Sequence, residues 1–149
     1  MNQKKSLLFR CLAILVVIAL AAPVSVEATE MIQPRASLYL DSYNAYVYPA
    51  GSGVVEVYFH AYGTNYMDEL GALKIQIYES TDGGEWEWVK TFKHNTTSGM
   101  LSYNDAYHCG HVTYQGVAGR YYKAYVCIWG GNDGDGDTRY FWTSVKKAT

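Results

Sequence analysis

Short segments in which polar and apolar residues alternate, separated by turns rich in glycine, run through most of this chain. In the stretch 54–62, every second residue from Val55 to Ala61 is apolar, which is the period of a half-buried β-strand. No segment of helical length has apolar residues at the spacing i, i+3, i+4 and i+7. The pattern predicts an all-β protein, an antiparallel two-sheet sandwich of seven to nine short strands.

The longest alternating segment covers residues 121–129, and a second strand candidate at 107–114 precedes it. Residues 115–119, which include two glycines, are expected to form the turn between them. Within 121–129, every second residue from Tyr122 to Ile128 can face a core. This segment is therefore expected to be a central strand of the sandwich.

The first 28 residues have the composition of a secretory signal peptide. Basic residues precede an apolar run of 11 residues, from Leu12 to Ala22, and a run of this length is too short to span a bilayer as a retained anchor. Small or apolar side chains stand at Val26 and Ala28, as a cleavage site after Ala28 requires. The sequence predicts a signal peptide at 1–28, a flexible leader at 29–35, a single β-sandwich domain at 36–149 and a secreted, extracellular protein.

Beyond Ala28 the chain has nine basic and 13 acidic residues, a net charge of −4. Nucleic acids and anionic membranes are bound by cationic patches, so neither is expected as a partner. No later apolar run could anchor the protein in a membrane once the signal peptide is removed. We expect an extracellular carbohydrate or protein as the partner, on account of the aromatic residues described below, and the sequence leaves the oligomeric state open.

Residues 116–126 read Gly-Val-Ala-Gly-Arg-Tyr-Tyr-Lys-Ala-Tyr-Val. This stretch resembles the beginning of strand F in immunoglobulin-like and fibronectin type III-like sandwiches, where a corner precedes a tyrosine whose hydroxyl binds back to the backbone. The resemblance makes Tyr122 that tyrosine. Immunoglobulin domains proper have a cysteine two residues later, and Ala124 stands there in this chain. As a whole, the sequence is similar to a small secreted sandwich family of Gram-positive bacteria.

Two cysteines, Cys109 and Cys127, follow the predicted signal peptide. A simple hairpin centred near residue 118 would place them opposite each other, as a cross-strand disulfide requires. In an immunoglobulin-like crossover the two strands belong to different sheets, and both thiols stay unpaired. We expect the disulfide, because free exposed thiols are a liability outside the cell.

An acidic loop, with Asp133, Asp135 and Asp137 alternating with glycine, follows the central strand. Carboxylates at every second position can converge on Ca²⁺, which takes six to eight oxygen ligands. The loop lacks the glycine and glutamate of an EF-hand, since Thr138 and Ser144 stand at those positions. A solvated hairpin loop is the alternative, because Asp and Gly are ordinary turn residues. Calcium is the only cofactor that the sequence suggests.

The histidines do not predict a zinc site. His108 and His111 are three residues apart in a strand and face opposite sides of it. His60 and His94 have no evident partner in the sequence.

Aromatic residues are expected to carry ligand binding, because flat rings pack against sugar rings and protein partners. The candidates are Tyr121, Tyr125, Trp129, Trp86 and Trp88. The alternative is that they form cross-strand pairs that only stabilise the sheets.

The sequence contains no motif for nucleophilic, metalloprotease or phosphate chemistry, and no catalytic residue is assigned. We expect a secreted, non-catalytic binding or interaction module of the bacterial cell envelope or exterior. A small secreted bacteriocin-like toxin is the first alternative, and a minor secreted hydrolase is the second.

Overall fold

The computed structural model describes residues 37–149, so the predicted signal peptide and leader lie outside the described residues. These residues form nine strands and no helix. The strands are β1 (Leu40–Gly51), β2 (Val54–Met67), β3 (Glu69–Ser80), β4 (Glu87–Lys93), β5 (Leu101–Ser102), β6 (Asp105–Gln115), β7 (Tyr121–Asn132), β8 (Asp135–Trp142) and β9 (Lys146–Lys147). Within this part of the chain, no helix has the length and apolarity needed to cross a membrane.

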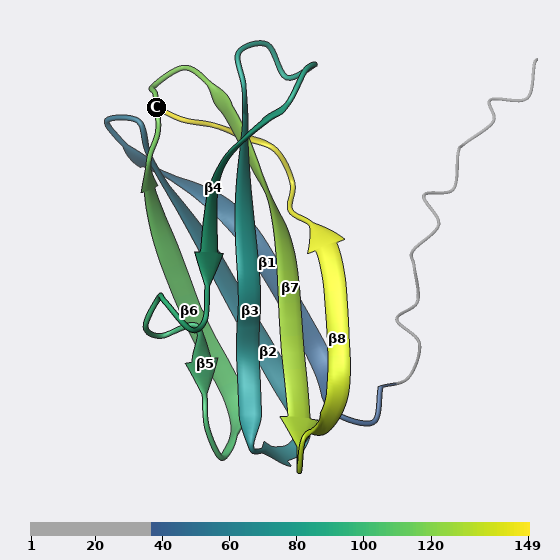
Figure 1. Ribbon diagram of the computed structural model, residues 1–149. Coiled ribbons are helices and arrows are strands. Elements are labelled where there is room, and N and C mark those ends of the chain that lie inside the picture. The colour runs from purple at the N-terminus through teal and green to yellow at the C-terminus, as the bar shows by residue number, and fades with distance from the viewer. Residues whose placement is uncertain (1–36) are drawn as a thin grey trace, which may run out of the picture. The chain divides into compact units, whose positions relative to one another are not determined.

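Two antiparallel sheets pack face to face (Figure 1). Sheet A has the order β1-β2-β6, and sheet B has the order β4-β3-β7-β8, with β5 beside β3 and β9 beside β7. Strands β1, β2 and β6 correspond to A, B and E of an immunoglobulin-type sandwich, and β3, β7 and β8 correspond to C, F and G. The predicted antiparallel sandwich is confirmed.

The core lies between the sheets and is built from the inward residues of alternating segments. The inward residues of β2, from Val55 to Ala61, are buried, as predicted, and so are Ile75 and Ile77 of β3. In the central strand β7, the side chains from Tyr122 to Ile128 that were expected to face inward are fully buried. The alternation of apolar residues therefore correctly predicts which face of these strands is buried in the core.

The corner before β7 is held by Tyr122, as the resemblance implies. The Tyr122 hydroxyl accepts a hydrogen bond from the backbone N–H of Val117 at 2.8 Å and donates one to the carboxylate of Glu79. Glu79, only 8% exposed, also pairs with Arg120. Gly116 permits this arrangement, because a Cβ there would lie 2.5 Å from the hydroxyl oxygen. Burial, together with the bond to Glu79, raises the pKa of Tyr122 to about 12.

The expected hairpin between β6 and β7 is wrong, and so is the disulfide that it implied. Strand β6 pairs with β2 in sheet A, whereas β7 pairs with β3 in sheet B. Cys109 is exposed on sheet A, Cys127 is buried on sheet B, and both are free thiols. The short link 116–120 carries the chain across the sandwich because its corner is tied to Tyr122 on the other sheet.

Candidate functional site

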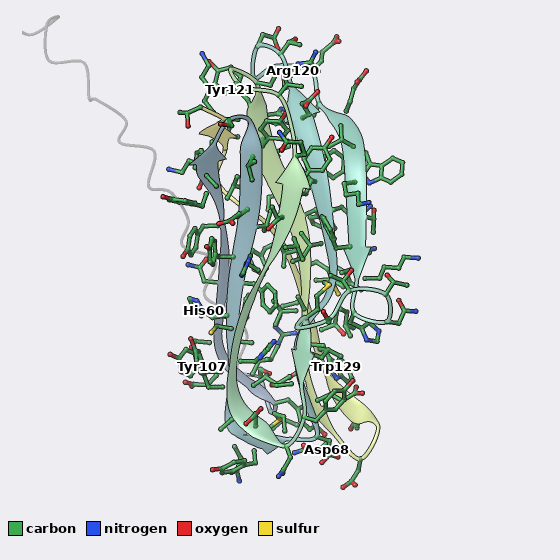
Figure 2. All side chains as sticks on the ribbon, turned by 90° about the vertical axis from the view of Figure 1, so that its left-hand side faces the viewer. His60, Asp68, Tyr107, Arg120, Tyr121 and Trp129 are labelled. Atoms are coloured by element: carbon green, nitrogen blue, oxygen red, sulfur yellow. The ribbon has the colours of Figure 1, made fainter. Side chains whose placement is uncertain are left out.

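The aromatic residues predicted to bind a ligand are distributed along sheet B. Tyr121 and Trp129 share the outward face of β7, but they lie near opposite ends of this 12-residue strand (Figure 2). At the Tyr121 end, the Lys147 ammonium lies 5.2 Å from the centre of the tyrosine ring. Tyr121 and Trp129 therefore cannot contact one small ligand.

The middle of this face forms a continuous aromatic surface, which we call the sheet B surface. Its rings come from β3, β4, β7 and β8 and from the turn before β4, and they are Tyr78, Trp86, Trp88, Tyr125, Tyr140 and Trp142. The ring centres of Tyr125 and Trp142 are 4.8 Å apart. The ammonium of Lys123 lies over two rings, 4.3 Å from the centre of Trp86 and 4.5 Å from the centre of Trp142. The structure thus brings Trp86 and Tyr125 together through Lys123 and Trp142. Trp88, 59% exposed, stands beside Tyr78 at the edge of the surface.

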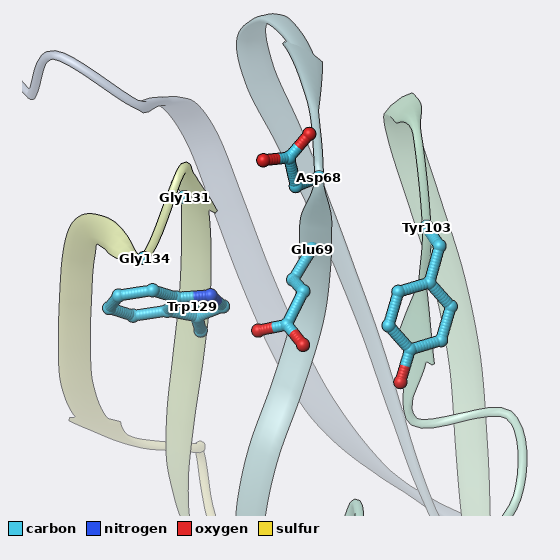
Figure 3. A pocket seen from close by; sticks show the side chains of 6 residues that line it. All are labelled: Asp68, Glu69, Tyr103, Trp129, Gly131 and Gly134. Carbon is cyan, nitrogen blue, oxygen red and sulfur yellow. The ribbon is translucent and has the colours of Figure 1, made fainter.

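Trp129 lines a separate pocket at the end of the sandwich, with a volume of about 400 Å³. The other residues of this Trp129 pocket are Asp68, Glu69, Tyr103, Gly131 and Gly134. Figure 3 shows the Glu69 carboxylate between the indole of Trp129 and the ring of Tyr103. Two of the six lining residues are acidic and none is basic. The pocket therefore combines aromatic walls with hydrogen-bond acceptors and disfavours an anionic ligand.

Glycines of the β7–β8 hairpin hold the indole of Trp129 in place. Gly131 and Gly136 are paired across the hairpin, and a Cβ on either one would come within 2.6 Å of the six-membered ring of Trp129. The indole therefore lies directly against the hairpin backbone. Its Nε1 atom is buried and has no hydrogen-bond partner among the described residues.

Hydrogen bonds between loops fix the shape of the pocket. The carboxylate of Asp68 accepts from the backbone N–H of Asp133 at 2.7 Å, and the N–H of Asp68 donates to the side chain of Asn132 at 2.6 Å. The backbone of Asn104 donates to the carbonyl of Asp68 at 3.3 Å. The β2–β3, β5–β6 and β7–β8 connections thus meet at Asp68, which preorganises the walls.

Two carboxylates of the acidic loop accept hydrogen bonds from other parts of the protein. Asp137 accepts from the hydroxyl of Ser37 and from the N–H of Leu38, and the bond from Ser37 is the main reason that the pKa of Asp137 is lowered. Asp135 accepts from the hydroxyl of Tyr39 at 3.2 Å. No three His, Cys, Asp or Glu side chains are grouped to hold a metal within residues 37–149. Calcium at Asp133, Asp135 and Asp137 stays a prediction, and a rise in unfolding temperature at millimolar calcium would support it.

A second hollow, which we call the sheet A groove, lies on the outer face of β2 and β6 and has a volume of about 350 Å³. Its lining residues are Tyr46, Tyr58, Phe59, His60, Tyr107, Cys109, Gly110 and His111. A hydrogen bond with the Cys109 thiol is the main cause that raises the pKa of Tyr107 to about 12. In Figure 2, His60 and Tyr107 lie on the left-hand side of the molecule and Trp129 on the right-hand side, toward the same end.

Sequence reasoning found Trp129 but missed the residues around it. Asp68 and Tyr103 come from two other connections of the chain and Glu69 is the first residue of β3, and nothing in the sequence places them beside β7. The available signal was the run of glycines after Trp129, because residues without a Cβ let a large ring lie against the backbone.

No protein-family model matches this sequence, and no curated protein matches it. Among solved structures, the chain is similar to the sporulation control protein Spo0M from Bacillus subtilis, with 9% identity, a TM-score of 0.40, and coverage of 68% of this chain and 47% of that one. A family 76 glycoside hydrolase from a bovine Bacteroides thetaiotaomicron strain has 16% identity, a TM-score of 0.30, and coverage of 71% and 20%. A protein from Archaeoglobus fulgidus has 8% identity, a TM-score of 0.34, and coverage of 74% and 98%. The chain thus spans less than half the length of the first two structures.

Proposed function

We propose that this protein is an extracellular, non-catalytic binding module that holds a sugar ring of a carbohydrate in the Trp129 pocket. The observation that carries this proposal is the wall of the pocket, where the carboxylate of Glu69 lies between the indole of Trp129 and the ring of Tyr103. The sequence pattern of a signal peptide supports the extracellular location.

The chemistry of the wall favours a hydroxylated ligand. The hydroxyls of a sugar can donate hydrogen bonds to the carboxylate of Glu69. The apolar face of a sugar ring also packs against the aromatic walls, Trp129 and Tyr103.

The state of Asp68 supports binding without hydrolysis. Glycoside hydrolysis ordinarily uses two carboxyl groups on opposite sides of the bond to be cleaved. Asp68 already accepts a bond from the backbone of Asp133, which leaves Glu69 as the carboxylate free to meet a ligand. The volume of about 400 Å³ lies in the range of small-molecule binding sites.

The experiment is a screen of purified protein against cell-wall polysaccharides and a glycan array, followed by calorimetric titration of the strongest ligand. Trp129→Ala is expected to weaken binding at least about 10-fold, which corresponds to about 1.4 kcal/mol. Glu69→Gln should also weaken it while the fold is retained, because a charged acceptor is lost. Trp88→Ala is the matched control, since it removes an exposed tryptophan from the sheet B surface.

The control also separates two binding modes. Unchanged affinity in Trp88→Ala together with loss in Trp129→Ala supports the pocket. Loss in Trp88→Ala alone would contradict the pocket and move binding to the sheet B surface. Release of shorter sugars from the bound glycan would contradict a non-catalytic module and support the hydrolase alternative.

A further inference from the structure

Three side chains that can ligate a transition metal line the sheet A groove. His60 of β2 is the direct cross-strand partner of Cys109 of β6. His111 follows Cys109 by two residues on the same strand, so both side chains project from the same face. All three residues line the groove.

The spacing of these positions suits one metal ion. Directly opposed residues of antiparallel strands have Cβ atoms about 4.5–5.5 Å apart. Positions i and i+2 of a strand are roughly 7 Å apart along the chain. Imidazole and thiolate arms that start from such a triangle can meet at one ion, because Zn²⁺ binds nitrogen at about 2.0–2.1 Å and thiolate sulfur at about 2.3 Å.

We propose that His60, Cys109 and His111 bind one first-row transition-metal ion of the Zn²⁺ class on the outer face of sheet A, with a fourth position open to solvent. One thiolate and two imidazoles are ligands that such ions prefer over Ca²⁺ or Mg²⁺. This site shares no residue with the Trp129 pocket and lies on the other sheet.

Binding requires the imidazoles to turn. His111 stacks on Tyr58 at 5.1 Å between ring centres, and His60 meets the edge of Tyr62 at 6.0 Å. With the rings in these positions, no three potential ligands within residues 37–149 are grouped as a bound ion would hold them. Cys109 and His111 are exposed and His60 is half-buried, so rotation about their side-chain bonds meets no core packing.

The test is titration of the reduced, tag-free full chain with Zn²⁺ in competition with a chromophoric chelator, and with Co²⁺ followed by absorption. We expect one equivalent to bind, and Co²⁺ should show thiolate-to-metal charge transfer. Cys109→Ser should abolish the charge-transfer band and weaken Zn²⁺ binding at least about 100-fold, since removal of even a supporting residue costs 10–100-fold. His60→Ala and His111→Ala should each weaken binding at least about 10-fold.

Two control variants make the result specific. Cys127→Ser removes the buried thiol of sheet B, and His94→Ala removes an exposed imidazole beyond β4. Both should bind Zn²⁺ as the unchanged chain does, with far-UV circular dichroism confirming that all variants are folded. The proposal is overturned if no one-to-one complex forms, if Cys109→Ser retains the charge-transfer band, or if a control variant loses binding to the same extent.

Discussion

Replacing Tyr122 by Phe tests the interaction that routes the chain from sheet A to sheet B. The substitution keeps the buried ring and removes a hydroxyl that bonds to the N–H of Val117 and to the carboxylate of Glu79. A hydrogen bond to a charged group contributes about 1.5–3 kcal/mol and a neutral one about 0.5–1.5 kcal/mol. Val117 is half exposed, so water can replace part of its lost bond. We therefore expect unfolding to become easier by about 2–3 kcal/mol.

Urea denaturation followed by tryptophan fluorescence measures this change, and thermal unfolding should show a midpoint lower by roughly 8–12 °C, since about 1 kcal/mol shifts a domain of this size by about 4 °C. Tyr48→Phe is the control, because its hydroxyl is on a side chain that is 52% exposed and the change should stay within about 0.5 kcal/mol. A loss below about 0.5 kcal/mol in Tyr122→Phe would refute the view that this hydroxyl holds the corner.

The same hydroxyl gives a pH signature. The pKa of Tyr122 is about 12 in the folded protein against an ordinary value of 10.0. Because the folded state holds this proton more tightly, the contribution to stability is complete below pH 10 and is lost as pH rises from 10 toward 12. The difference in unfolding free energy between the unchanged chain and Tyr122→Phe should therefore shrink over that interval. A constant difference from pH 9 to pH 12 would show that the hydroxyl is not buried as described.

The remaining predictions concern the two thiols and the packing of the Trp129 indole against the β7–β8 hairpin. Burial raises the pKa of the Cys127 thiol. Protein without the predicted signal peptide, which contains the third cysteine of the sequence, should therefore react rapidly with about one equivalent of a thiol reagent at Cys109 and slowly with a second at Cys127. Cys109→Ser should remove the rapid phase, and two rapid equivalents would contradict the burial of Cys127. Gly136→Ala should displace the indole of Trp129, change its near-UV circular dichroism and weaken glycan binding. Gly83→Ala is the control, since it strains a turn with positive φ while its Cβ meets no other atom within 4 Å. An equal loss of binding in this control would contradict the role of the hairpin glycines in positioning the indole.

Local pattern was sufficient for the inward side of the strands because the core imposes a period of two on any half-buried strand. The residues from Val55 to Ala61 could be assigned from that period alone, and the resemblance placed Tyr122 at its corner. Local pattern was insufficient for the pairing of strands. A short link usually joins neighbouring strands, but the link 116–120 crosses between the sheets. Cys109 and Cys127 therefore lie on different sheets and do not form the predicted disulfide.

Both candidate sites depend on pairings between distant segments. The Trp129 pocket needs Gly131 opposite Gly136, which a single hairpin supplies, but it also needs Asp68 to accept a bond from a loop that is 65 residues further along the chain. The metal site needs His60 opposite Cys109, and a slip of one residue in the β2–β6 register would turn these side chains to different faces. That register is fixed by the inward residues, because Val57 must meet Val112 in the core. The apolar side of β2 and β6 therefore determines which outward residues face each other, and the residues proposed to bind metal are positioned by side chains that never touch it.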